Sequence, residues 1–105
     1  MATPYSEASD VMIILQTTDE MLETEIEACI TGADALIDSL LEPHDLAVPA
    51  VTPQNIKDAS AHFAAWLFRK RRDPAGADAF KQEAETFLQA YIESSAEVAF
   101  KVATA

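Results

Sequence analysis

The most regular hydrophobic pattern in the chain lies between residues 18 and 42. Apolar residues recur there at steps of three or four positions, which is the period of an α-helix. They are Leu22, Ile26, Ile30, Ala33, Ile37 and either Leu40 or Leu41. Thr18 is a suitable N-cap, and Pro43 ends the pattern because proline disrupts a helix interior. We therefore expect a long amphipathic helix over residues 18–42.

A short helix is expected before this one and a largely buried helix after it. Ser6 is a suitable N-cap for the short helix, which has an apolar face at Val11, Ile14 and Leu15 and stops near residue 16. The segment 43–53 contains three prolines and is expected to be a loop. Thr52 and Pro53 then fit the N-cap and first position of a helix. Because that helix is apolar on nearly all sides over residues 61–68, we expect it to be central.

A fourth helix is expected to begin at Asp73 and Pro74 and to continue to about residue 93. Its apolar stripe consists of Phe80, Ala84, Phe87, Leu88, Tyr91 and Ile92. Beyond it, Val98, Phe100 and Val102 stand at every second position, which is typical of extended chain. The sequence therefore predicts an all-α bundle of four main helices over residues 1–93. An extended C-terminal tail over residues 94–105 is either disordered or binds a partner.

The charge of the chain is distributed unevenly. Its 105 residues include 18 acids and 7 Lys or Arg, which give a formal net charge of −11. Residues 1–56 carry eleven of the acids and neither Lys nor Arg, whereas residues 57–105 carry seven acids and all seven bases. This balance disfavours general DNA binding, because phosphate contacts need Lys and Arg.

Two charged clusters are the candidate interaction surfaces. An acidic surface is expected on the outer face of the 18–42 helix, from Glu23, Glu25, Glu27, Asp34 and Asp38. A basic cluster closes the central helix, from Arg69, Lys70, Arg71 and Arg72. The basic cluster has three interpretations: a solvated helix end favoured by the helix dipole, a surface that pairs with the acids of another copy, or a contact with nucleic acid.

Catalytic and metal chemistry has little support in the sequence. A single cysteine, Cys29, permits no intramolecular disulfide or Cys/His zinc motif and is expected to be a small buried residue. His44 and His62 are interpreted as ordinary polar residues, and the two glycines form no phosphate-binding loop. We expect no enzyme activity, cofactor or metal. No signal peptide or membrane span is recognisable in the sequence.

Several segments resemble the head–tail connector proteins (adaptor and head-completion proteins) of long-tailed bacteriophages and gene transfer agents. The resemblance covers about residues 4–92 and its motifs are diffuse. The matching segments are Tyr5-Ser6-x-x-x-Asp10-Val11, Thr18-Asp19-Glu20, Val48-Pro49, Pro53-x-x-Ile56-Lys57-x-Ala59, Arg69-x-Arg71-Arg72 and Asp73-Pro74-Ala75-Gly76-Ala77-Asp78-Ala79-Phe80, with Ala84, Leu88 and Tyr91 beyond. The loop at 43–52 is shorter than the arm that relatives often have, so contacts made by such an arm are not expected here.

The resemblance implies a structural protein that forms a ring, typically of twelve copies, beneath the capsid portal. Such a ring extends the DNA channel and contacts the next head-completion or tail protein, and DNA passes nearby without specific binding. Because the C-terminal segment of these proteins commonly docks onto the portal, Val98, Phe100 and Val102 are the expected portal-binding residues. The implied location is the virion, after assembly in the host cytoplasm.

Two other functions fit the residues. A small nucleic-acid-binding regulator would use the basic end of the central helix, and its DNA binding would be sensitive to salt. The second alternative is a small cytoplasmic adaptor unrelated to phage.

Overall fold

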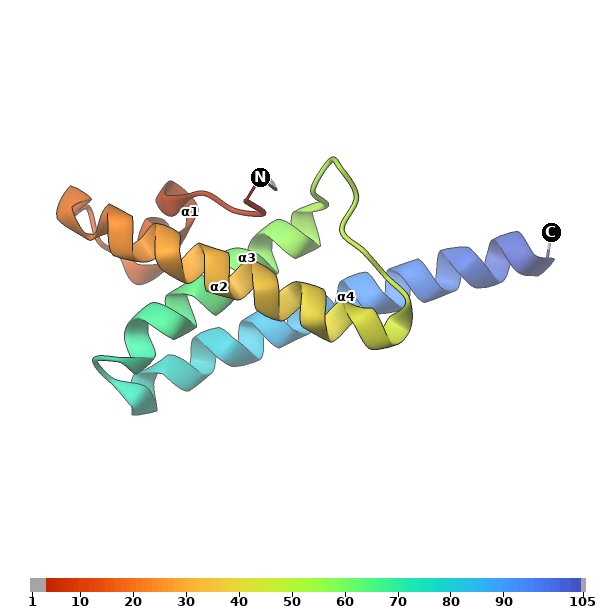
Figure 1. Ribbon diagram of the computed structural model, residues 1–105. Helices are drawn as coiled ribbons and strands as arrows, with labels where there is room; N and C mark the ends of the chain where they lie inside the picture. The colour runs from red at the N-terminus through yellow and green to blue at the C-terminus, as the bar shows by residue number, and fades with distance from the viewer. Residues whose placement is uncertain (1–3, 105) are drawn as a thin grey trace.

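The computed structural model describes the backbone of residues 4–104 and the side chains of residues 4–95. It has four α-helices, α1 (Ala8–Leu15), α2 (Glu23–Leu41), α3 (Gln54–Lys70) and α4 (Pro74–Thr104), with 3₁₀ turns η1 (Glu20–Leu22) and η2 (Glu42–His44) (Figure 1). Within residues 4–104 the chain forms no strand, which confirms the predicted all-α class.

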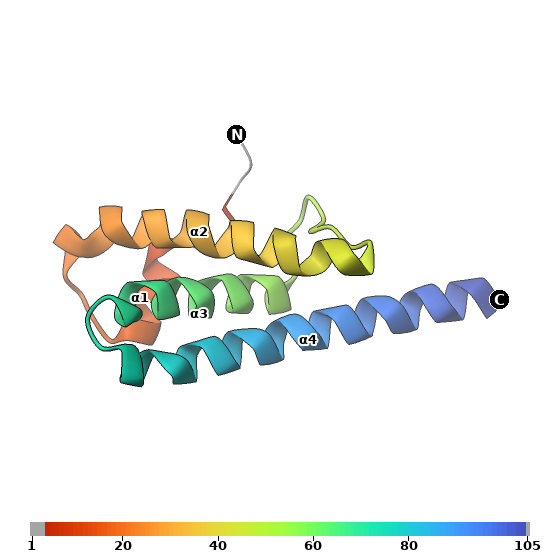
Figure 2. The same cartoon turned by 60° about the horizontal axis from the view of Figure 1, so that its bottom comes forward.

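The central helix is α3, as the sequence predicted. It contacts α1, α2 and α4, and Figure 2 shows it between α2 and α4. Small buried residues on α3 (Ala59, Ser60, Ala61, Ala64 and Ala65) let the neighbouring helices approach closely. On the α2 side, Gly32 also permits a close approach, because a Cβ there would lie 3.3 Å from Leu67 Cδ1 of α3.

The predicted apolar stripes form the core. From α2, the buried residues are Ile26, Cys29, Ile30, Ala33, Ile37 and Leu41. From α3, Ile56, Phe63 and Phe68 add the large side chains, and from α4, Ala84 and Leu88 are buried. The period of three to four in the sequence therefore identified the faces that pack together.

The N-terminal cap of α1 differs from the prediction. Glu7, and not Ser6, is the N-cap, and the Glu7 N–H donates to Asp10 Oδ2 at 2.9 Å. Ser6 is buried, and its hydroxyl lies 2.7 Å from Ser60 Oγ of α3. The serine that looked like a helix cap is thus a tertiary contact.

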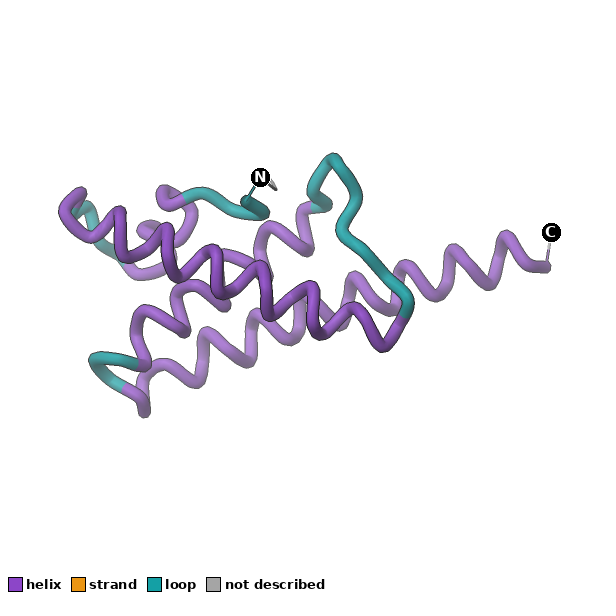
Figure 3. Tube along the Cα trace, viewed as in Figure 1, coloured by secondary structure: helices purple, strands orange, loops and turns teal. Residues whose placement is uncertain are grey.

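The start of the second helix is also displaced from Thr18. Asp19 caps η1, because its Oδ1 accepts the Met21 N–H at 3.0 Å, and α2 begins only at Glu23. At the other end α2 stops at Leu41, and Figure 3 shows the loop that follows η2 before α3 begins. The long predicted helix over 18–42 is therefore an α-helix flanked by two 3₁₀ turns.

The third and fourth helices begin near the predicted prolines. Pro53 is the N-cap of α3, one residue after the predicted Thr52. α4 begins at Pro74, and the Gly76 N–H donates to Asp73 Oδ1 at 3.2 Å, as expected for an Asp cap followed by proline. A Cβ at Gly76 would collide with the Asp73 carboxylate, so glycine makes room for this cap.

The C-terminal segment differs most from the prediction. Residues 94–104 are not an extended tail, because α4 continues as a helix to Thr104. The segment contains neither Gly nor Pro and is rich in Ala, so nothing in it stops a helix that α4 has already nucleated. The period-of-two pattern that predicted extended chain consists of only three apolar residues, Val98, Phe100 and Val102. In Figures 1 and 2 the final turns of α4 project beyond the bundle.

Candidate functional site

The basic cluster at the end of α3 is partly paired within the chain. Arg72 donates to Glu25 of α2 from Nη1 at 3.2 Å and from Nη2 at 2.9 Å, and its guanidinium lies 4.0 Å from the centroid of the Phe68 ring. Arg71 Nη1 is 3.7 Å from Glu25 Oε1. The hydrogen bonds from Arg72 hold the pKa of Glu25 below its ordinary value. Glu25 and Arg72 thus join two predicted clusters in one copy of the chain.

Lys70 of the basic cluster and Lys81 of α4 both lie close to Trp66. Lys70 Nζ lies 4.5 Å from the centroid of the Trp66 ring, and Lys81 Nζ of α4 lies 5.2 Å from it. The ring packs edge-on against buried Phe63, with 6.5 Å between ring centroids. Arg69 Nε is buried without a hydrogen-bond partner among the described residues. We call Trp66, Lys70 and Lys81 the Trp66 patch.

The predicted acidic surface contains a half-buried carboxylate. Asp34 Oδ2 accepts the Tyr5 N–H at 3.0 Å, and Asp34 Oδ1 accepts the Ser60 hydroxyl at 2.6 Å. Since that hydroxyl has one proton, the Ser6 hydroxyl donates to Ser60 Oγ. Burial raises the pKa of Asp34. Asp34 therefore fastens the N-terminal segment to the bundle.

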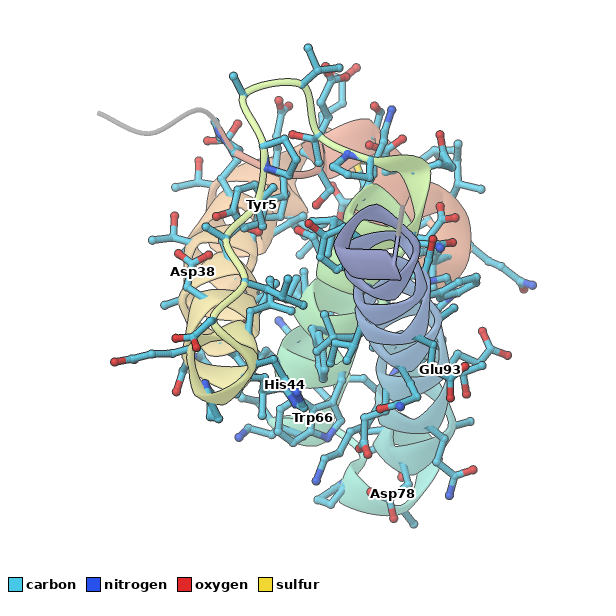
Figure 4. The ribbon with its side chains drawn as sticks, turned by 90° about the vertical axis from the view of Figure 1, so that its right-hand side faces the viewer. Tyr5, Asp38, His44, Trp66, Asp78 and Glu93 are labelled. Atoms are coloured by element: carbon cyan, nitrogen blue, oxygen red, sulfur yellow. The ribbon has the colours of Figure 1, made fainter. Side chains whose placement is uncertain are left out.

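A second acid on the same face holds the same segment. Asp38 Oδ1 accepts the Tyr5 hydroxyl at 2.5 Å on the surface. Burial and this carboxylate both raise the pKa of the Tyr5 phenol, so the phenol keeps its proton and remains a donor. Figure 4 labels Tyr5 and Asp38 near each other, beside α2. Neither Asp34 nor Asp38 is a free member of an acidic surface.

Two predicted acids remain exposed beside an open groove. Glu23 and Glu27 line this groove together with Pro4, Ser6, Glu7, Ala8, Ser9, Ile30 and Thr31. It lies between the start of the chain with α1 on one side and α2 on the other. We call it the acidic groove, after Glu7, Glu23 and Glu27.

The two histidines do not come together as a site. His62 Nδ1 is 2.8 Å from the Asp58 carbonyl oxygen, its Nε2 is 3.0 Å from Glu83 Oε2, and its ring lies 5.2 Å from that of Phe87. These contacts connect α3 to α4. His44 is exposed on η2.

Cys29 is buried in the core, as the sequence predicted. Burial raises the pKa of its thiol, which opposes formation of the reactive thiolate. Among the described side chains, no three His, Cys, Asp or Glu residues are grouped as a metal site. No described helix has the length and apolar composition needed to span a membrane.

The expected portal-binding residues are placed only by their backbone. Val98, Phe100 and Val102 belong to the last turns of α4, and their side chains lie outside the described residues. The same holds for Lys101.

Sequence reasoning missed the contribution of α4 to the basic surface. Lys81 is separated from Lys70 by the turn between α3 and α4, so no sequence run connects them. A signal was present nevertheless, because short connections make antiparallel neighbours and bring the first turns of α4 beside the last turns of α3. Glu25 and Arg72 lack such a signal, because a longer connection over residues 42–53 joins α2 to α3.

Comparison of the chain with models of known families, with curated proteins and with solved structures gives no significant match.

Proposed function

We propose that the chain is a structural head–tail connector protein, which forms a ring beneath a capsid portal and joins head to tail. The observation that carries the proposal is the final part of α4, which leaves the bundle as a helical projection (Figure 2). A helix that projects from a compact body suits insertion into a groove on a larger partner. The sequence resemblance supplies the identity of that partner.

The residues behind the resemblance have structural roles that support a shared fold. Tyr5 and Ser6 fasten the start of the chain to α2 and α3. Asp19 caps η1, and Asp73 with Gly76 caps α4. A family related through such positions would share a framework, as expected for subunits that act by assembling.

The charge distribution supports a position close to DNA without binding it. The chain carries 18 acids against 7 bases, and several acids of α2, among them Glu23 and Glu27, are exposed. An acidic wall repels phosphate, so a DNA channel lined by it would let the duplex pass without adhesion. The number of copies in the ring is proposed as twelve from the resemblance.

A direct test uses the portal protein of the same genome. The chain is mixed with purified portal rings, and the products are imaged by electron microscopy. We expect an additional ring on one face of the portal, and a variant that ends at Glu93 should fail to add it while keeping its thermal unfolding transition. A portal that never acquires density from the full chain would overturn the proposal.

The nucleic-acid regulator is less well supported by the structure. Arg71 and Arg72 both contact Glu25, so two of the four bases of the cluster are already paired with a carboxylate of the same chain. Salt-sensitive DNA binding by the free chain at low ionic strength would favour this alternative.

A further inference from the structure

The cations of the Trp66 patch differ from Lys57, Arg71 and Arg72, which are paired with carboxylates. Lys57 lies 3.8 Å from Asp10, and Arg71 and Arg72 share Glu25. Among the described side chains, neither Lys70 nor Lys81 lies within 4.0 Å of a carboxylate, although the chain has more than twice as many acids as bases. Two positive groups therefore gather around one half-buried ring without a counter-charge.

Such an arrangement favours an anionic partner. The two ammonium groups repel each other, and a carboxylate that arrives between them would remove that repulsion. The tryptophan adds a large, rigid apolar surface of the kind that often dominates binding energy at protein interfaces. The matching partner surface therefore has carboxylates beside exposed apolar side chains.

The acidic groove of the same chain has this chemistry. Glu23 and Glu27 stand one helical turn apart on α2, and Pro4 supplies an exposed apolar side chain in the same groove lining. Met21 lies in η1, just before α2 and outside the groove lining. It is 91% exposed and offers an apolar contact that suits an aromatic ring. Figure 4 shows Trp66 on the opposite side of the bundle from Tyr5, which is next to the groove.

We propose that the Trp66 patch of one copy docks against the acidic groove of the next copy, with Lys70 and Lys81 pairing with Glu23 and Glu27. Because the two surfaces are different and lie on opposite sides, the contact is head-to-tail and repeats from copy to copy, which generates a ring when the rotation closes. The inference rests on the proposed function for the closure of that ring. A second copy is proposed in place of nucleic acid, because phosphate binding draws on several free Lys and Arg and two bases, Lys70 and Lys81, surround the Trp66 ring.

Zero-length carbodiimide coupling tests the contact, since it joins only amines and carboxylates that already touch. A mixture of isotopically light and heavy chains at high concentration is coupled, digested and analysed by mass spectrometry. We expect mixed light–heavy links between Lys70 or Lys81 and Glu23 or Glu27. Absence of intermolecular links, or links that join other residues, would overturn the inference.

A charge swap tests the same pairing with two complementary variants, so that the failure of one variant to fold does not decide the result. The K70E/K81E chain places acid against acid, and the E23K/E27K chain places base against base. Each alone should lose at least about tenfold in self-association, measured by sedimentation of chains or by ring formation on the portal. Mixing the two variants should restore assembly, because each copy then meets a complementary neighbour on both sides. Failure of the mixture to assemble, with both variants folded, would reject the pairing.

A matched control separates this contact from general charge effects. The E85K/E93K variant changes the net charge as much as E23K/E27K does, but at exposed positions of α4. It should assemble like the unaltered chain.

Phosphate or DNA that protects Lys70 and Lys81 from coupling, in place of a second copy, would also overturn the inference. If the predicted links form but the portal is not bound, the proposed function fails while the docking contact stands.

Discussion

Two carboxylates on α2 respond to their surroundings in opposite ways. Glu25 accepts two hydrogen bonds from Arg72 near the surface, and the pKa of Glu25 is lowered. Asp34 lies two and a half turns further along the helix, and burial raises the pKa of this carboxyl even though two donors reach it. The acids of this one helix therefore include an ion-pair partner, a structural acceptor and exposed surface charge.

The opposite shifts predict opposite pH dependences of stability. Asp34 has a raised pKa in the folded state, so its contribution favours folding at low pH and is lost as pH rises through that pKa. Glu25 has a lowered pKa, so its contribution is present at neutral pH and is lost as pH falls through the folded-state pKa. The following substitutions separate the two contributions, beginning with the largest expected effect.

Removing the Ser60 hydroxyl should cost the most. Ser60→Ala deletes the donor to Asp34 and the acceptor for Ser6 at a fully buried position, which should destabilise the chain by about 1–3 kcal/mol. Urea unfolding followed by circular dichroism measures the change. Ser9→Ala, at an exposed serine of α1, is the matched control and should leave the midpoint unchanged. Equal midpoints for the two variants would show that the buried network adds little.

Removing the Tyr5 hydroxyl should have a smaller effect. Tyr5→Phe leaves the backbone bond to Asp34 in place and deletes only the exposed bond to Asp38. We expect a loss of about 0.5–1 kcal/mol in the free energy of unfolding. A loss as large as that of Ser60→Ala would mean that the phenol, and not the buried serine, holds the N-terminal segment.

Neutralising Glu25 should have a still smaller effect that depends on salt. Glu25→Gln removes the charge that Arg72 and Arg71 share, so the unfolding midpoint should fall slightly at low salt and match that of the unaltered chain at high salt. The variant should also lose part of the acid-side decline in stability. A salt-independent loss would contradict an electrostatic origin.

Replacing Asp34 by Asn should change stability least at neutral pH. The Asn oxygen can accept the Tyr5 N–H while its amide donates to Ser60, which then donates to Ser6, so all three contacts are kept and the two that involve Ser60 reverse their direction. The gain in stability that Asp34 contributes toward acid should disappear, as measured by unfolding across the acidic pH range. Asp34→Ala, which removes both acceptors, is the contrasting variant and should be clearly less stable.

The sequence predicted the faces that pack but not the polar contacts between them. Ile26, Ile30 and Ile37 follow the helical period, and burial of such a stripe is a local property that the sequence expresses directly. The bond from Ser60 to Asp34 depends on how α2 and α3 are rotated against each other, which no local pattern specifies. Ser6 was misassigned for the same reason, since a good capping residue is also a good buried hydroxyl partner.

The end of α4 shows the limit of short periodic patterns. Val98, Phe100 and Val102 satisfied a period of two, yet the backbone continues as a helix. Three positions are too few to outweigh helix-forming neighbours and a helix that is already nucleated. For the candidate site, the charge runs located the basic and acidic surfaces, whereas their division into paired and unpaired groups needed the packing of α2, α3 and α4.

The attachment of the N-terminal segment has a consequence for the order in which the chain acquires its structure during synthesis. Tyr5 must wait for Asp34, which is 29 residues later, and Ser6 must wait for Ser60, which is 54 residues later. Tyr5 and Ser6 therefore cannot both be fastened until α2 and α3 have been synthesised. Contacts between α3 and α4 span a much shorter stretch of chain and close faster. We expect the segment around Tyr5 and Ser6 to be among the last parts of the bundle to find its place.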